Sequence, residues 1–204
     1  MNRDDAKPKK RVFSIGHSNH PMEKFLELLK THGIEILADV RSHPYAKYAT
    51  HFDSKPLKEA LAGAGIKYIF LGRELGGLPD DDEFYDDEGY ILYSRVAASP
   101  KFVEALERLS AGAGQYKIAV MCGEEDPAQC HRRLLIGRVL EERGVRMDHI
   151  RGDGRVATEE ELQEAEREPE SDQLSLFKEA PKEKPWRSIQ SVSPKGRRPN
   201  SSGR

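Results

Sequence analysis

The chain has 204 residues, of which 37% are hydrophobic and 33% charged, and its formal net charge at pH 7 is −2. This length and hydrophobic content can bury one full core but hardly two. No apolar run reaches the length of a membrane span and the first ten residues lack a signal peptide's apolar stretch, so we expect a cytoplasmic protein without membrane contact.

Strand and helix patterns alternate along the chain. Residues 1–10 are expected to form a disordered leader. Short apolar runs predict buried strands at 11–15, 34–40, 66–71, 117–121 and 145–150. Helical spacing and capping residues predict intervening helices that begin at Pro21, near Leu57, at Ser99–Pro100, at Asp126–Pro127 and at Thr158 with its capping-box partner Glu161. The pattern predicts one three-layer α/β domain over residues 11–168, with a mostly parallel sheet of about five strands and helices on both faces.

Composition changes after residue 168 to Pro, Ser, Lys, Arg and Glu, which predicts a disordered basic tail over residues 169–204. From residue 178 onward there are eight basic and two acidic side chains, a net of +6, which leaves −8 for residues 1–177. An acidic folded part does not indicate a broad nucleic-acid groove, although the basic tail could contact phosphate groups.

Four polar clusters follow the predicted strands. Ligands of parallel α/β sheets bind beyond the carboxyl ends of the strands, so we expect these clusters to form one site. The residues that we expect to bind substrate are Gly16, His17, Ser18, Asn19, Ser42, Tyr48, Glu74, Gly76 and Gly77. The acidic run Asp80–Glu88 matches no calcium-binding loop and is expected to be a solvated, mobile lid.

The segment Met121–Arg133 carries both cysteines at one strand-to-helix junction. A helix start favours anions and lowers thiol pKa values, so Cys122 could be a nucleophile or redox thiol assisted by His131. Alternatively, Cys122 is a small buried residue that packs like a hydrophobic one. The candidate catalytic residues are Cys122, Glu124, Cys130, His131, Arg132, Asp39 and Arg41.

Several of these candidates have two interpretations. Cys130 could be a resolving thiol, or a metal ligand together with Cys122 and His131. Adjacent residues of a helix point about 100° apart, which disfavours joint coordination, so we expect neither metal nor cofactor. Asp39 and Arg41 share one strand face and could form a structural ion pair, or act as general base and anion contact.

Four motifs resemble the bacterial domain-of-unknown-function 488 family, over about residues 11–151. They are IGHSN at 15–19, ADVRSHP at 38–44, ELGG at 74–77 and CGEEDPAQCHR at 122–132. The last motif matches the family's C-x-E-x-x-P-x-x-C-H-R through Cys122, Glu124, Pro127, Cys130, His131 and Arg132. The resemblance implies an α/β fold with the motifs grouped at one site, but no particular reaction.

A second resemblance lies in the tail, within residues 172–177. The sequence QLSLF is similar to the peptide with which bacterial repair and replication proteins bind the sliding clamp. In that resemblance a glutamine meets a polar edge and a Leu-Phe pair fills an apolar pocket. Alternatively, the segment packs back on the domain. The partner-binding residues would be Gln173, Leu174, Ser175, Leu176 and Phe177.

Three functions follow as hypotheses. The first is a cysteine-dependent enzyme that acts on a nucleotide or nucleic-acid component and is recruited to replication or repair by the clamp. The second is a non-catalytic adaptor that binds a nucleotide or protein and is tethered to the clamp. The third is a small-molecule sulfur-transfer or thiol-redox enzyme.

Overall fold

The computed structural model describes residues 10–45, 48–167 and 185–192, so the QLSLF peptide lies outside the described residues. In this part of the chain six strands form one sheet in the order β3-β2-β4-β1-β5-β6. Its pairings are parallel except for β5 with β6. The predicted, mostly parallel α/β sheet is confirmed, with one short antiparallel strand added. The strands are β1 Arg11–Gly16, β2 Ile36–Asp39, β3 Lys67–Phe70, β4 Ile118–Cys122, β5 Arg146–Ile150 and β6 Val156–Ala157.

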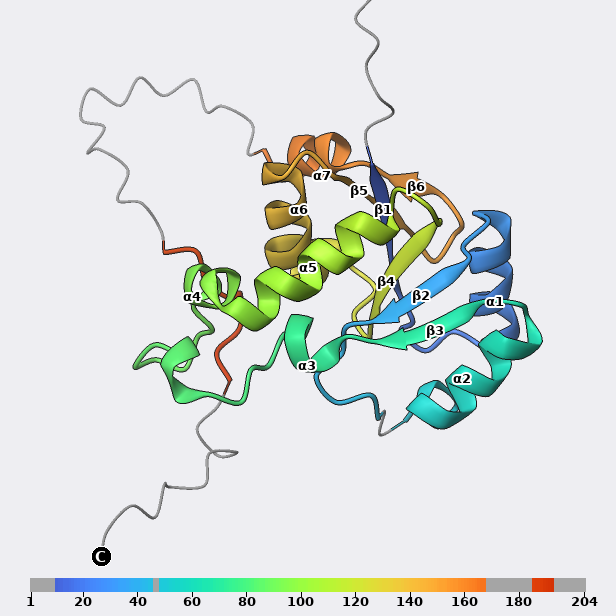
Figure 1. The fold of residues 1–204 in the computed structure, drawn as a ribbon, viewed down its shortest axis with the longest axis horizontal. Helices are drawn as coiled ribbons and strands as arrows, with labels where there is room; N and C mark the ends of the chain where they lie inside the picture. Colours follow the sequence, from blue (N-terminus) through green and yellow to red (C-terminus); the bar gives the residue numbers. More distant parts are fainter. Residues whose placement is uncertain (1–9, 46–47, 168–184, 193–204) are drawn as a thin grey trace, which may run out of the picture.

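Helices cover both faces of this sheet (Figure 1). One face packs on α1 Met22–Thr31 and α2 Ser54–Gly63, through apolar side chains such as Phe25 and Leu61. The other face packs on α4 Tyr93–Ala98, α5 Pro100–Gly112 and α6 Arg138–Glu142. The remaining elements are α3 Gly72–Leu75, α7 Glu159–Glu166, the 3-10 turns η1 Thr50–Phe52, η2 Asp82–Phe84 and η3 Pro127–Gln129, and the π-helix η4 Arg132–Gly137. None of the described helices combines the length and apolar character that crossing a membrane needs.

The capping residues explain where two helices begin. Ser99 Oγ accepts a hydrogen bond from Phe102 N, and Pro100 follows it, so α5 begins as predicted. Thr158 and Glu161 form the predicted capping box of α7. The prediction that the helix after β4 begins at Asp126–Pro127 is wrong, because these residues begin only the short turn η3.

The helix that η4 and α6 form begins later because the backbone of Cys130 is extended, with φ −120° and ψ 139°. The π-helix η4 follows directly and continues into α6. Single π turns within helices occur frequently at functional sites. The extended residue therefore separates η3 from the helix and changes the direction of the chain next to the end of β4.

A crevice opens at the carboxyl ends of β1 and β4, which pair so that Gly16 lies opposite Cys122. The chain leaves β1 toward α1 on one face of the sheet and leaves β4 toward η4 and α6 on the other. Adjacent parallel strands whose connections diverge in this way form the usual ligand crevice of an open α/β sheet. The two loops are joined by hydrogen bonds from His17 N to Cys122 O (2.9 Å) and from Ser18 N to Gly123 O (3.0 Å).

Residues 185–192 pack against the domain beside α4 (Figure 1), although the sequence predicted a disordered tail from residue 169. Trp186 Nε1 donates to Leu134 O (2.9 Å), and the Arg138 guanidinium lies 4.3 Å from the Trp186 ring centroid. Burial of the chain's single tryptophan is the physical reason for this difference, because a large aromatic ring removes much apolar area from water.

The same segment holds the acidic run that the sequence interpreted as a mobile lid. Arg187 pairs with Asp86 at 2.8 Å and with Glu88 at 2.9 Å. Arg187 also lies 3.9 Å from the centroid of the Tyr90 ring. These contacts hold the loop between η2 and α4 to the domain, so a free lid does not describe it.

Candidate functional site

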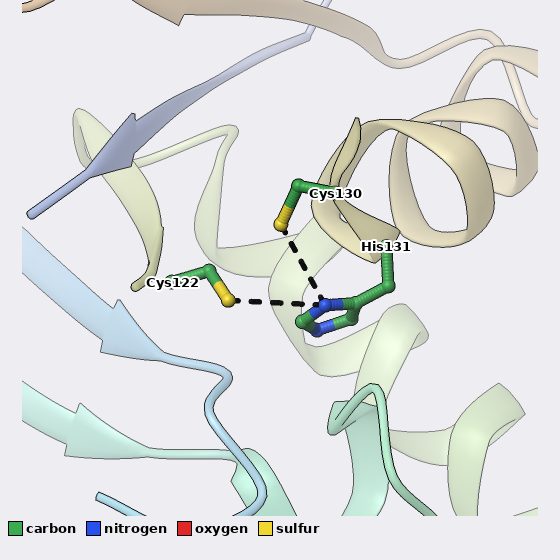
Figure 2. Close-up of side chains that lie close together, drawn as sticks. All are labelled: Cys122, Cys130 and His131. Atoms are coloured by element: carbon green, nitrogen blue, oxygen red, sulfur yellow. Dashed lines mark hydrogen bonds between the residues drawn. The ribbon is translucent and has the colours of Figure 1, made fainter. Parts of the chain in front are cut away.

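Three side chains converge at the end of β4: Cys122, Cys130 and His131. Their ligand atoms all lie within 4.8 Å of one another. His131 Nδ1 is 3.9 Å from Cys122 Sγ and 3.7 Å from Cys130 Sγ. Figure 2 shows the two sulfur atoms directed at the imidazole. Cys122 comes from the end of the strand, and Cys130 and His131 come from the start of the helix. Both cysteines are free.

The extended backbone of Cys130 explains why this cluster forms. Cys130 precedes the helix, and His131 is the first residue with helical φ and ψ. The sequence argument against joint coordination assumed that both residues lie inside one helix, and that assumption is wrong. Cys130 and His131 can therefore both reach Cys122.

The His131 ring is held from two sides. Nε2 lies 3.2 Å from Val40 O. A carbonyl oxygen only accepts hydrogen bonds, so Nε2 donates to Val40 O and Nδ1 faces the two sulfurs. Gly77 lies against the ring, since a Cβ there would come within 2.7 Å of Nδ1. A glycine is thus required at position 77 for packing.

The two thiols differ in acidity. The hydrogen bond with Cys130, followed by the charge of His131, holds the pKa of Cys122 well below its usual value. The same hydrogen bond, with burial, raises the pKa of Cys130 well above its usual value. Burial, followed by the charges of Cys130 and Cys122, raises the pKa of the nearby Tyr93 hydroxyl. Cys122 is thus the more acidic of the two thiols.

A buried ion pair lies beside the cluster, between Asp39 and Arg41. Arg41 NH2 is 2.7 Å from Asp39 Oδ2, and Arg41 Nε is 3.0 Å from Asp39 Oδ1. Tyr68 donates its hydroxyl to Asp39 Oδ2 (3.0 Å), and burial raises the pKa of Tyr68 to about 12. The structure thus forms the ion pair that was one of the two interpretations. Its many hydrogen bonds give Asp39 a positioning role.

Arg41 in turn orients His17. Arg41 NH1 lies 3.2 Å from His17 Nε2, and because a guanidinium only donates, Nε2 is the acceptor. Nδ1 then donates to Ser18 O (2.7 Å), and the ring stacks on Phe52 with centroids 4.3 Å apart. Burial first, and the Arg41 charge after it, lower the pKa of His17. A neutral imidazole is therefore fixed beside Gly123.

Arg132 and Glu124 shape the loop that follows Cys122. The fully buried Arg132 donates to Ser14 Oγ (3.2 Å) and to the carbonyl oxygens of Glu124 and Glu125. Its guanidinium, predicted from the sequence to be catalytic, therefore binds backbone carbonyl groups. The exposed Glu124 accepts a hydrogen bond from Asp126 N (3.1 Å). Both residues hold the loop in place.

Comparison of the chain with protein families supports the resemblance that the four motifs indicated. The model of a family described as "Domain of unknown function DUF488" matches residues 21–139, which is more than half of the chain. The chain belongs to the DUF488 family. The matched range contains the cysteine cluster and the Asp39–Arg41 pair, whereas Gly16–Asn19 precedes it. No curated protein and no solved structure matches the chain.

Seven of the nine predicted substrate-binding residues of this DUF488 protein line two separate hollows, and Gly16 and Gly77 line neither of them. One, of about 290 Å³, is lined by residues from the β1 and β4 loops and by Tyr48. The other, of about 680 Å³, is lined by Ser42, Glu74 and Gly76 with part of the acidic run. Neither lining includes a member of the cluster, which is mostly buried. The first hollow is lined by His17, Ser18, Asn19, Tyr48, Ala49, Gly123, Glu124 and Glu125.

Sequence reasoning missed two residues of the DUF488 site, both of them tyrosines. Tyr68 binds Asp39 from the neighbouring strand β3, and Tyr93 lies near the cysteines. Gly76 was interpreted as substrate-binding, but a Cβ there would collide with Ser42 Oγ, whose hydroxyl accepts from Leu78 N (2.8 Å). These contacts join elements far apart in the sequence, so no local pattern indicates them.

Proposed function

We propose that this DUF488 protein is an enzyme that acts on a nucleotide or nucleic-acid component at the Cys122–Cys130–His131 cluster. The observation that carries the proposal is this convergence at the end of β4, where Cys122 directly precedes Gly123 in the wall of the hollow between the β1 and β4 loops. A perturbed, partly buried pair of thiols beside a fixed imidazole is typical of reactive sites. Asp39 and Arg41 act as positioning residues, through the orientation of His17.

The hollow of about 290 Å³ supports a nucleotide component as substrate. Its volume is close to the lower end of small-molecule sites, which suits a single base or sugar. Tyr48, 83% exposed, lines it together with the exposed amide side chain of Asn19. An exposed aromatic ring stacks on bases of any sequence, and an amide can hydrogen-bond to a base edge.

Replacing Tyr48 by alanine is expected to weaken nucleotide binding about tenfold, because stacking of one base on an aromatic ring contributes about 1–3 kcal/mol. Nucleoside monophosphates and short single-stranded oligonucleotides of each base would be titrated by calorimetry. Tyr116→Ala is the matched control, since Tyr116 is 47% exposed and lies before the amino end of β4, at the opposite edge of the sheet.

The proposal requires that Tyr116→Ala binds like the wild type. It also requires that a bound nucleotide or oligonucleotide is converted by the wild type and not by Cys122→Ser. Absence of binding for every probe would overturn the nucleotide assignment. Binding without conversion would favour the alternative, a non-catalytic adaptor.

We also propose that the tail recruits the protein to the bacterial sliding clamp through Gln173–Phe177. The support is the sequence pattern QLSLF, with two leucines and a phenylalanine in a polar segment. A peptide that orders on binding should have a dissociation constant in the micromolar range, which corresponds to a binding free energy of about −8 kcal/mol. Contact of the basic tail with nucleic acid would add to this recruitment.

Replacing both Leu176 and Phe177 by alanine is expected to abolish clamp binding and leave the melting temperature unchanged, because these anchors would not belong to the core. Calorimetric titration of the clamp into both proteins measures the first effect, and thermal unfolding the second. No heat with the wild type would refute recruitment. A lowered melting temperature in the variant would indicate that the segment packs on the domain instead.

One observation favours a second candidate function, a thiol-redox or sulfur-transfer enzyme. The two sulfur atoms lie within 4.8 Å of each other, and the pKa of Cys122 is lowered while that of Cys130 is raised by the hydrogen bond between them. An attacking thiolate with an adjacent resolving thiol has this arrangement.

A further inference from the structure

We propose that Cys122, Cys130 and His131 bind one zinc ion, with a fourth coordination position open to water or a substrate atom. The inference concerns the site of the proposed function and rests on it only for the role of the ion. Binding itself can be measured without any substrate.

The positions of the three ligand atoms fit tetrahedral zinc. Zinc binds sulfur at about 2.3 Å and nitrogen at about 2.0–2.1 Å, which places a sulfur and a nitrogen ligand about 3.6 Å apart in a tetrahedron. The structure has 3.9 Å and 3.7 Å between His131 Nδ1 and the two Sγ atoms. These two distances need to change by only a few tenths of an ångström to accommodate an ion, and the two sulfur atoms lie within 4.8 Å of each other.

The surroundings of His131 provide an independent argument. Metal-binding histidines almost always donate their other ring N–H to a carboxylate, a carbonyl or water, which fixes the tautomer and the ring. His131 Nε2 has such a partner in Val40 O at 3.2 Å. The exposed fractions of Cys130 and His131 are only 3% and 9%, so their ligand atoms are shielded and held in place.

The loop between the two cysteines is also fixed. Arg132 binds the carbonyl oxygens of Glu124 and Glu125. The Glu125 carboxylate accepts from Arg151 Nε (3.0 Å) and NH2 (2.9 Å) and from Gly152 N (3.1 Å). Cys122 and Cys130 are therefore presented at a constant separation, as a preformed metal site requires.

The donor set selects the metal and indicates the kind of site. Two thiolates and one imidazole suit zinc and exclude hard cations such as magnesium and calcium. Three protein ligands are typical of catalytic zinc, in which the ion lowers the pKa of a bound water to about 7. Cys122, the partly exposed ligand, directly precedes Gly123 in the wall of the 290 Å³ hollow, so metal and substrate positions would adjoin.

The test is the metal content of the full chain, produced with zinc and purified without chelator. We expect about one zinc per chain by elemental analysis, and at least a tenfold loss in Cys122→Ser, Cys130→Ser and His131→Ala. His43→Ala, which changes an exposed histidine outside the cluster, should retain the metal. Cobalt substitution should give absorption bands of a tetrahedral thiolate complex, and these bands should be lost in Cys130→Ser.

Thiol alkylation keeps the inference testable if a variant fails to fold. In the wild type both thiols should react slowly, and chelation of the metal should speed both reactions at least tenfold. Wild-type protein without zinc, with two reactive thiols or a Cys122–Cys130 disulfide, would overturn the inference and favour the thiol-redox candidate. Bound zinc without nucleotide binding would retain the metal site and refute the proposed substrate.

Discussion

Replacing Asp39 by asparagine is expected to lower the free energy of unfolding by about 3–5 kcal/mol, because it leaves the Arg41 guanidinium buried without its counter-charge. Asp39 is fully buried and Arg41 is 7% exposed, so water cannot compensate for the loss. Urea denaturation of the wild type and of Asp39→Asn measures the difference.

A double-mutant cycle separates the ion pair from the shape of the side chains. Arg41→Met alone should also destabilise, while Asp39→Asn together with Arg41→Met should destabilise by less than the sum, with a coupling of about 2 kcal/mol. The exposed pair Lys24–Glu27 is the control, and Glu27→Gln should change stability by roughly 0.5 kcal/mol or less. Additive effects at Asp39 and Arg41 would contradict the strong pairing.

Replacing Gly16 by alanine is expected to destabilise the protein by about 3 kcal/mol or more. The added Cβ would overlap Glu124 O and come within 2.6 Å of Glu125 Cα, and backbone atoms cannot rotate away as a side chain can. The loop after Cys122 would have to move, and with it the hydrogen bonds that join it to His17 and Ser18.

Gly63→Ala is the matched control for this substitution. Gly63 is the last residue of α2, and a Cβ there would have no neighbour within 4 Å. Alanine is the better helix former, so this variant should be more stable by about 0.5–1 kcal/mol. Thermal and urea unfolding of both variants give the two signs. A Gly16→Ala protein as stable as the wild type would show that the two loops do not pack closely.

The sheet could be predicted from the sequence because its strands are short apolar runs bounded by glycine and polar residues. Arg11–Gly16 and Ile118–Cys122 lie within one or two residues of the predicted limits. The location of the polar clusters could also be predicted from the sequence, because every cluster follows the end of a predicted strand. Capping residues such as Ser99 bond to residues only a few positions away, so the sequence alone indicates where their helices begin.

The interior of the site could not be predicted in the same way. The extended conformation of Cys130 interrupts the chain between η3 and the helix, and no propensity of the segment 127–132 indicates it. Whether Ser42 and His17 share a hollow depends on how loops from different strands pack, and the structure places them in separate ones. For residues 185–192 the sequence offered one unused signal, the tryptophan at position 186 within a polar stretch.

The strand order has a consequence for how the chain folds during synthesis. In the described sheet β1 and β2 each pair with β4, and β4 lies between them. A nascent chain that ends before residue 118 therefore carries His17 and Arg41 after two strands, β1 and β2, that lack their common neighbour. Pairing between distant segments is slow, because loop closure costs entropy before contacts form. Since β4 also carries Cys122, the insertion of the central strand also assembles the cluster, so the site should mature only after β1 and β2 have both paired with β4.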